Sequence, residues 1–552
     1  MEQNPGNQDH SRHQEQSRDQ EQDLGALAAL SPFELKDRLI AAASGTERMM
    51  LNAGRGNPNF LATLPRRAFL ALGDFAVSES ERSYSYLDSG FGGLPEQEGM
   101  LGRFNSFVVH DPQREGLQFL RSAVSYVHDQ LGLDREAFLA EMVTAFLGCV
   151  YPTPPRVLPQ TEEVLRAYLE QELLGGEARA GAFDVFPTEG GTAAMSYLFS
   201  SLAVNGLLAP GDRIALATPI FSPYLEIPLL PDYGLDVVQV IMDESADWRL
   251  PEAELEKLLD PAVKVFCLVN PSNPPSSKQP QQVLDRLSQL VEKDRPDLII
   301  ITDDVYATFA DDFVSVFAAC PRNTVCVYSF SKYFGATGWR LGTIALHREN
   351  VIDELLQSLP PADKERLNAR YSSLTTDIPG LKFIDRLVAD SRSVALNHTA
   401  GISGPQQVQM ELFALHGLMD RLDRYKDAAK ALIRGRYNTL YRNMGVAPTP
   451  APDDVGYYSL IDLRKLAVRL YGEDFAAWLV SHEDLGLRFL LRLASETGVV
   501  LLPGQGFDDV VPSVRVSLAN LTDFEYRAIG AATRRILDDY HQMYTEADPG
   551  QV

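Results

Sequence analysis

One lysine in the segment from 328 to 342 follows two serines and precedes an arginine. Ser329 and Ser331 come just before Lys332, and Arg340 lies about two helical turns further along. A lysine amine can hold an aldehyde as a Schiff base, hydroxyl groups can bind phosphate, and arginine pairs with phosphate through two parallel hydrogen bonds. These residue types indicate a pyridoxal phosphate site. Taken alone, the same residues also fit a strand that ends in a polar turn.

The elements around this segment predict how such a site would be assembled. Apolar runs alternate with helical stretches between Gly181 and His347, which is the pattern of parallel βαβ units. The runs cover residues 213–217, 263–269, 298–302, 324–328 and 341–346, and the middle three lead into polar clusters at 270–273, 303–306 and 329–332. Because ligands bind at the carboxyl ends of strands in open α/β sheets, we expect these clusters to converge in one cleft.

Further motifs stand in a fixed order along the chain. They are Glu189-Gly190-Gly191-Thr192 before a predicted helix, Pro219 to Tyr224, Asn270 to Pro275, Asp303-Asp304-Val305-Tyr306, and Val514-Arg515-Val516-Ser517. The amides of a glycine-rich turn at a helix start can hold a phosphate. In this order, from about residue 48 to 540, the motifs resemble the fold type I pyridoxal phosphate enzymes, the aspartate aminotransferase superfamily.

The resemblance implies a role for each motif. Lys332 is the catalytic residue that holds the cofactor and moves protons, Asp303 pairs with the pyridine nitrogen, and Arg515 binds the substrate α-carboxylate. The other implied cofactor contacts are the ring-stacking Phe221, the O3′ partners Asn273 and Tyr306, the phosphate-binding Gly191, Thr192, Ser329, Ser331 and Arg340, and Tyr86 reaching across a dimer interface. Arg82 or Tyr84 would replace Tyr86 if the register shifts by a few residues. For Asp304 we expect a solvated turn, and Pro275-Ser276 departs from the usual Thr-Gly.

Other segments narrow the reaction. Residues 50–60, 65–69, 104–176 and 401–407 resemble the aspartate 4-decarboxylases. That resemblance implies conversion of L-aspartate to L-alanine and CO2 through quinonoid, ketimine and enamine intermediates, with side transamination to oxaloacetate. Arg55, beside the substrate-facing Gly56, is either a second cation for a dicarboxylate or a surface arginine, and Thr399 is a candidate substrate contact. The alternatives are a plain aminotransferase of aspartate or another amino acid, and a non-catalytic protein that keeps the fold.

The domain organisation follows from composition and pattern. The expected parts are a disordered tail over 1–23, an N-terminal segment of the small domain with an interface arm over 24–103, a helical extension over 104–180, a large cofactor-binding domain over 181–420 and a C-terminal small domain over 421–552. Ser31 and Pro32 predict a helix start. The fold class is α/β, with a mostly parallel sheet in the large domain and an α+β small domain built from both ends of the chain.

The composition limits the kinds of partner that the protein is expected to bind. The 552 residues carry a formal net charge of -25, so no basic face for nucleic acid is expected. No apolar run reaches membrane-spanning length, and Cys149, Cys267, Cys320 and Cys326 show no metal-ligand spacing. We expect buried thiols, no metal and a cytoplasmic protein that acts on L-aspartate and keto acids. By resemblance it is a homodimer at minimum and could assemble as far as a dodecamer.

Overall fold

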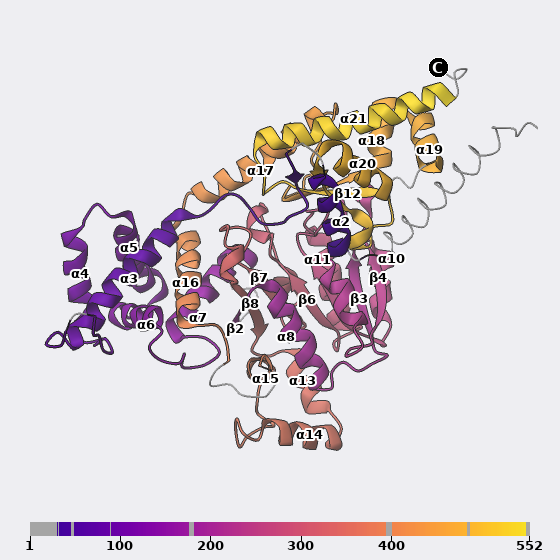
Figure 1. Ribbon diagram of the computed structural model, residues 1–552. Helices are drawn as coiled ribbons and strands as arrows, with labels where there is room; N and C mark the ends of the chain where they lie inside the picture. Colours follow the sequence, from indigo (N-terminus) through magenta and orange to yellow (C-terminus); the bar gives the residue numbers. More distant parts are fainter. Residues whose placement is uncertain are drawn as a thin grey trace, which may run out of the picture. The chain divides into compact units, whose positions relative to one another are not determined.

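The computed structural model describes residues 30, 32–45, 49–88, 90–175, 182–392, 400–482 and 486–547 (Figure 1). The chain forms two compact units, a larger one of residues 57–431 and 451–455 and a smaller one of the residues up to 56, 432–450 and those from 456 onward. The tail expected over 1–23 and the expected helix cap Ser31 lie outside the described residues. Residues 57–103, which we expected to divide between the small domain and an interface arm, lie in the larger unit.

A central sheet organises the larger unit, and its seven described strands run in the order β2-β8-β7-β6-β5-β3-β4. The strands are β2 (Phe183–Thr188), β3 (Arg213–Thr218), β4 (Asp236–Ile241), β5 (Val263–Val269), β6 (Ile299–Asp303), β7 (Thr324–Ser329) and β8 (Gly342–His347). Every predicted run is a strand, and the strands from β7 to β4 are parallel.

The expectation of parallel pairing is wrong for β8, which runs antiparallel to both β7 and β2. Between β7 and β8 the described chain contains only a short 3-10 helix, Thr337–Trp339. A parallel connection needs a crossover that carries the chain back along the sheet, and no helix does this here. The chain therefore returns beside β7 in the opposite direction, and this return holds the segment around Lys332.

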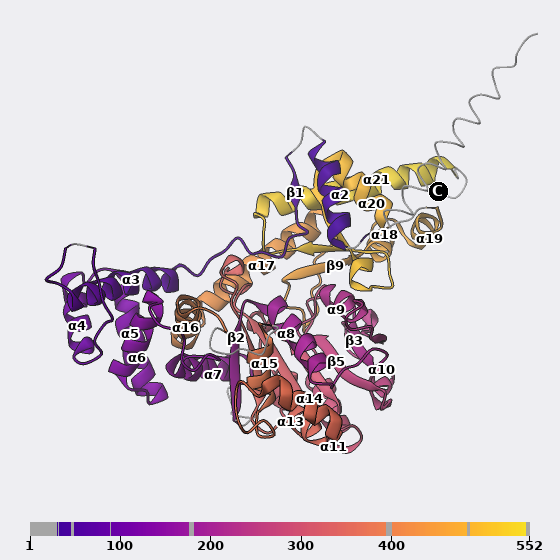
Figure 2. The same ribbon diagram turned by 60° about the horizontal axis from the view of Figure 1, so that its bottom comes forward.

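Helices cover the sheet. They include α8 (Gly191–Val204), α11 (Gln281–Lys293), α12 (Val316–Ala319), α13 (Val351–Ser358) and α15 (Phe383–Asp390), with the short α9 (Pro223–Glu226) and α10 (Glu252–Leu255) at its β3–β4 side and α14 (Pro361–Tyr371) beyond α13 (Figures 1 and 2). In α11 the spacing of Leu284, Leu287 and Leu290 places them on one face, and they join one buried cluster with Phe266 and Ile300.

The extension that we expected to be helical is helical. It contains α4 (Met100–His110), α5 (Glu115–Leu131), α6 (Arg135–Leu147) and α7 (Pro159–Leu173), which pack with α3 (Thr63–Ser83) and α16 (Gly404–Met419). Figure 2 shows this group of helices together. The proline-rich stretch 151–155 lies in the irregular segment between α6 and α7.

The smaller unit combines both ends of the described chain. It holds α2 (Pro32–Ser44), β1 (Leu51–Asn52), the C-terminal part of α17 (Arg424–Asn443), β9 (Tyr458–Asp462), α18 (Leu463–Tyr471), α19 (Glu473–His482), α20 (Leu487–Thr497), β10 (Val499–Val500), β11 (Leu502–Pro503), β12 (Ser513–Ser517) and α21 (Asp523–Ala547). β1 pairs with β10, and β11-β12-β9 form a small antiparallel sheet. The helix predicted after Ser31 and the strands predicted near 457–461, 499–502 and 513–517 are confirmed.

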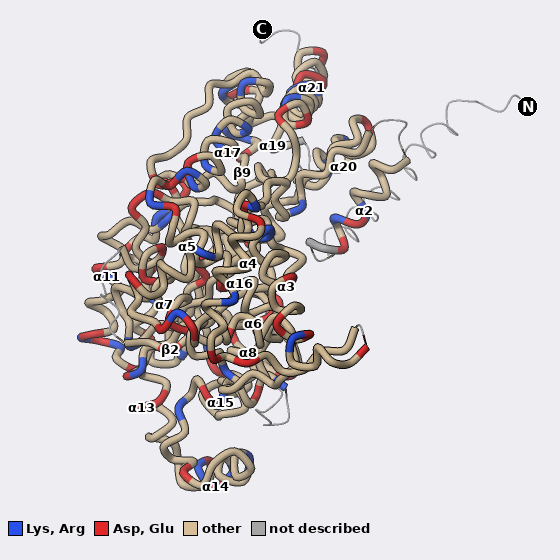
Figure 3. The backbone as a smooth tube through the Cα atoms, turned by 90° about the vertical axis from the view of Figure 1, so that its left-hand side faces the viewer, with Lys and Arg blue, Asp and Glu red and all other residues tan. Residues whose placement is uncertain are grey.

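The structure also shows how charged residues and cysteines are distributed and how apolar the helices are. Basic and acidic residues are interspersed along the described chain without a continuous basic segment (Figure 3). No helix in the described part of the chain is long and apolar enough to cross a membrane. Cys267, Cys320 and Cys326 are buried, but Cys149 is exposed, because it follows Gly148 in the loop that leaves α6.

Candidate active site

Lys332 lies in the return between β7 and β8, just past the carboxyl end of β7. The turn before it is held by Ser329, whose hydroxyl donates to Ser331 Oγ (3.0 Å) and to the carbonyl of Leu341 (3.2 Å). The Phe330 amide also donates to the Leu341 carbonyl (3.1 Å), which ties the turn to the start of β8. Lys332 is half-buried, while both serines are buried. The loop therefore presents the lysine amine from a fixed backbone.

Asp303 ends the neighbouring strand β6, and its carboxylate is 7% exposed. It accepts hydrogen bonds from the Val305 amide (3.3 Å) and the Tyr224 hydroxyl (3.3 Å). Burial raises the pKa of Asp303 to about 6, and those two hydrogen bonds and the charge of Lys332 oppose the shift. The lysine and the carboxylate thus sit close enough to interact, as the order of the strands predicts.

A second pair of polar side chains lies at the same end of the sheet. Asn273, in the loop after β5, and Tyr306, after β6, are both 3% exposed, and the Asn273 amide donates to the Tyr306 hydroxyl (3.5 Å). The Asn273 loop contains the unusual Pro275-Ser276, where Ser276 has a φ of +65°, and it is closed by a hydrogen bond from the Ser277 amide to Ser272 Oγ (3.1 Å). The polar clusters after β5, β6 and β7 therefore converge.

The glycine-rich turn meets the arginine of the lysine segment. Helix α8 begins at Gly191, so the free amides of its first turn lie at residues 191 onward. A Cβ placed on Gly190, where φ is +96°, would lie 2.7 Å from Arg340 Nη2, and one placed on Gly191 would lie 3.7 Å from Ser329 Cβ. Gly191 is half-buried, whereas the side chains of Thr192 and Arg340 are exposed. Amides, a hydroxyl and a guanidinium thus lie together at the start of α8, and these are the groups that bind a phosphate.

One residue near this cluster was not predicted as part of the site. Tyr224 is fully buried and donates to Asp303, and its pKa is raised well above the usual range, first by burial and then by the charge of Asp303. Its position in the motif with Phe221 was the available signal. Phe221 itself is half-buried after β3, and its carbonyl accepts from the Tyr224 amide (3.0 Å).

Asp304 corrects an expectation. We expected a solvated turn, but the Asp304 side chain is 0% exposed. Its carboxylate accepts from Thr302 Oγ1 (2.6 Å), from the Ser315 hydroxyl and from Cys326 Sγ (3.5 Å). Burial raises the pKa of Asp304 to about 7 against those hydrogen bonds. β6 ends at Asp303, but the residue after it is enclosed as well, so both aspartates are buried.

The arginines expected to bind substrate belong to the smaller unit. Arg515, in β12, is 4% exposed and lies between the rings of Tyr458 and Phe507, with 4.4 Å and 4.6 Å from its guanidinium carbon to the ring centroids. Its Nη2 donates to the Gly54 carbonyl (2.8 Å). Arg55 is exposed, and the next carbonyl, that of Gly56, accepts from the Tyr457 hydroxyl (2.8 Å).

Tyr86 and its alternative Arg82 lie at and after the end of α3. Tyr86 is 78% exposed in the loop after α3, where its ring contacts that of Tyr84 at 6.1 Å between centroids. Arg82 pairs with Glu96 at 3.0 Å. Thr399 lies outside the described residues.

The residues of the larger unit fit pyridoxal phosphate. They offer a lysine amine, a buried carboxylate for a protonated ring nitrogen, and a helix start at which Arg340 approaches Gly190 so closely that a Cβ there would collide with it. Asn273 and Tyr306 supply polar groups for the ring oxygen.

Comparisons with known proteins place the chain in a family. The family model for class I and II aminotransferases matches residues 154–531. A bifunctional aspartate aminotransferase and L-aspartate beta-decarboxylase of Pseudomonas sp is 57% identical over 523 residues, 95% of this chain and 98% of that protein. A bifunctional aspartate aminotransferase and glutamate/aspartate-prephenate aminotransferase of Petunia hybrida is 32% identical over 26% of this chain and 30% of its own length.

Solved structures show the same fold. A mutant aspartate aminotransferase of Thermus thermophilus matches with a TM-score of 0.57 and 17% identity over 92% of this chain and 97% of that one. The aspartate aminotransferase of Thermotoga maritima matches with a TM-score of 0.53 and 18% identity, over 93% of this chain and 97% of that one. The fold is therefore that of the fold type I enzymes. Since the family model covers most of the chain and the Pseudomonas protein aligns nearly from end to end, the chain belongs to the class I and II aminotransferase family, together with that bifunctional aspartate aminotransferase and L-aspartate beta-decarboxylase.

Proposed function

We propose that this chain is a pyridoxal phosphate enzyme that converts L-aspartate to L-alanine and CO2 and also transaminates aspartate to oxaloacetate. The observation that carries the proposal is the alignment with the Pseudomonas protein. The name of that protein states both activities, and the alignment covers 98% of its length. The alignment extends well beyond residues 154–531, so the N-terminal helical region shares in the similarity.

The larger unit would hold the cofactor. Lys332 would bind its aldehyde carbon, while the α8 amides, Ser329 and Arg340 would bind its phosphate. When bound, the cofactor supplies an electron sink conjugated with the substrate Cα. Ser331, Thr192, Phe221, Asn273 and Tyr306 would complete the binding set, and Tyr86 would reach the phosphate in a second copy of the chain. The homodimer and the cytoplasmic location stay predictions.

The main task of the side chains would be to hold and transfer protons. Asp303, as a carboxylate, would hold the proton on the pyridine nitrogen, and the positive charge beside it would keep Asp303 ionised. Lys332 Nζ would take the proton from Cα and return protons to the product. The bond from Cβ to the side-chain carboxyl carbon then breaks. CO2 leaves without the bonding electron pair, which stays with Cβ, and a proton adds to Cβ in place of the carboxyl group.

The arginines would orient the dicarboxylate. Arg515 would pair with the α-carboxylate, because its rings and the Gly54 carbonyl fix the guanidinium plane. Arg55 would orient the side-chain carboxylate only loosely. That carboxylate loses its charge as CO2 leaves, so a tight ion pair would stabilise the ground state rather than the transition state.

The test supplies holoenzyme with L-aspartate and no keto acid. Alanine and CO2 in equal amounts over many turnovers would support the proposal, whereas one turnover that ends with oxaloacetate released would indicate a plain aminotransferase. We expect Arg55→Ala to change the ratio of CO2 to oxaloacetate. The exposed Arg527 in α21 provides the control Arg527→Ala, which should leave the ratio unchanged. An unchanged ratio in Arg55→Ala would exclude the role given to Arg55.

A further inference from the structure

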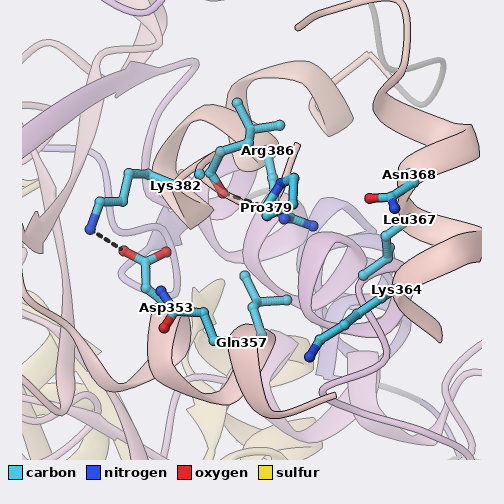
Figure 4. A pocket seen from close by; sticks show the side chains of 11 residues that line it. Asp353, Gln357, Lys364, Leu367, Asn368, Pro379, Lys382 and Arg386 are labelled. Atoms are coloured by element: carbon cyan, nitrogen blue, oxygen red, sulfur yellow. Dashed lines mark hydrogen bonds and ion pairs between the residues drawn. The ribbon is translucent and has the colours of Figure 1, made fainter. Parts of the chain in front are cut away.

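A pocket in the larger unit lies between α13, α14 and α15 (Figure 4). Its volume is about 360 Å³, and its lining includes Asp353, Lys364, Lys382 and Arg386 with the apolar Leu356 and Leu367. None of its lining residues belongs to the group around Lys332. The volume is in the range of small-molecule sites, which are mostly apolar with a few polar groups that set orientation.

Two of the charges in this pocket balance each other. Asp353 Oδ2 lies 3.3 Å from Lys382 Nζ, and the same carboxylate accepts from the Phe383 amide (2.7 Å) and the Asn350 side chain (2.8 Å). Figure 4 shows the Lys382 amine directed at Asp353. The cations that remain are Lys364 and Arg386.

Arg386 is a buried cation that makes no direct contact with a carboxylate among the described residues. It is 5% exposed. Its guanidinium donates to the carbonyls of Leu381 (3.1 Å) and Ile378 (3.1 Å) and to Asn205 Oδ1 (3.2 Å), all uncharged acceptors. These bonds use three of its five N–H groups. Among the described residues it makes no ion pair.

A buried charge is costly unless it is paired, so Arg386 favours an anion in the space beside it. Burial lowers the pKa of the Arg386 guanidinium, while the charges of Asp353 and Asp390 oppose that shift from beyond ion-pair distance. Lys364 makes no ion pair within the described residues either. Figure 4 shows its side chain extending toward the Gln357 side of the pocket.

We propose that this pocket binds a small organic acid, whose carboxylate pairs with Arg386 and Lys364 and whose apolar body packs against Leu356 and Leu367. The local excess of positive charge stands out in a chain of net charge -25. The apolar wall favours an organic acid over an inorganic anion, because an inorganic anion would leave that wall without a partner.

The test is a calorimetric titration of the holoenzyme with butyrate, inorganic phosphate and chloride at low ionic strength. Two exposed lining residues give variants that should fold normally, Lys364→Glu and Asn368→Glu. We expect butyrate to bind, and each variant to weaken its binding by about tenfold or more, since each places an acid beside the carboxylate. The control Lys293→Glu, an exposed lysine on α11, should bind butyrate as the unmodified protein does.

Three outcomes would overturn the proposal. Butyrate that does not bind would leave Arg386 a purely structural cation. Binding equally strong in Lys364→Glu, Asn368→Glu and Lys293→Glu would place the butyrate elsewhere, for instance at the substrate arginine. Phosphate that binds as tightly as butyrate would make this a site for inorganic anions. Decarboxylation and transamination should persist in all three variants, which separates this site from the proposed function.

Discussion

Asp303 and Asp304 are neighbours in the sequence but have different partners. Successive side chains of a strand point to opposite faces, so Asp303 meets Tyr224 whereas Asp304 meets Ser315 and Cys326. Only Asp303 therefore faces the space beside Lys332. The same division explains why one carboxylate can serve the cofactor while the other fastens the turn that carries it.

Cofactor binding should depend on pH through Asp303. Burial raises the pKa of Asp303 to about 6 in the free protein, and the pyridinium needs the ionised form. Affinity for pyridoxal phosphate should thus be full well above that pH and weaken as the pH falls toward it. Equilibrium titrations of Lys332→Ala would measure this without Schiff-base chemistry, with the midpoint moved upward because the lysine charge no longer lowers the pKa of Asp303. We expect Asp303→Asn in the same background to bind more weakly, by about a hundredfold at pH 8.

The cofactor phosphate also titrates near pH 6, so the double variant is the control for it. The pH dependence of cofactor affinity that remains in the double variant is due to the phosphate. The difference in pH dependence between Lys332→Ala and the double variant is due to Asp303. If the two proteins lost affinity in parallel on acidification, the ionisation of Asp303 would not govern binding.

At the scale of elements, Asp390 ties α15 to α8 and α14. It is 4% exposed and accepts from Ser201 Oγ (2.8 Å), the Tyr371 hydroxyl (2.7 Å) and Arg370 Nη2 (2.8 Å). Removing one partner of a buried ion pair leaves the other charge uncompensated. Since α8 begins at the predicted phosphate cradle, this network also supports the site.

We expect Asp390→Ala to lower the free energy of unfolding by about 3 to 5 kcal/mol, as seen for broken buried ion pairs. Urea denaturation followed by circular dichroism would measure it. Asp363→Ala provides the control, because the side chain of Asp363 in α14 is 43% exposed and its ion pair with Arg366 spans 3.8 Å. Exposed pairs contribute about 0 to 1 kcal/mol, so equal losses in the two variants would contradict the role of Asp390.

The elements also show what the sequence could predict. Buried parallel strands are continuous apolar runs, so β5, β6 and β7 and the polar residues that follow them could be located in advance. The direction of β8 could not, because it depends on how the chain returns past Lys332. Nor could the burial of Asp304, whose partner Ser315 lies on another element, or the pocket at Arg386, which three helices form together. Local patterns do not contain such long-range packing.

At the scale of the whole molecule, stability depends on acids that folding buries without a cation. Glu411, in α16, is 1% exposed, and the described residues give its carboxylate oxygens no hydrogen bond of normal geometry, although Thr161 is near enough to lower its pKa slightly. The nearby Glu141 is better supplied, since it accepts from the amides of Gln160 (3.1 Å) and Thr161 (2.9 Å) at the start of α7. Burial, and next the charge of Glu141, raise the pKa of Glu411 well above its usual range.

Glu411 should therefore make the protein less stable as the pH rises. Above the pKa of the unfolded chain, only the folded state keeps the proton, so folding binds a proton and becomes less favourable with each pH unit. The glutamine of Glu411→Gln cannot ionise. The free energy of unfolding of this variant, minus that of the unmodified protein, should therefore increase by up to about 1.4 kcal/mol per pH unit between pH 5 and 8. Urea denaturation at several pH values would measure the difference, with the exposed Glu365→Gln on α14 as control. The buried amide could cost stability at every pH, so the slope of the difference carries the argument. A difference independent of pH would mean that Glu411 is ionised in the folded protein.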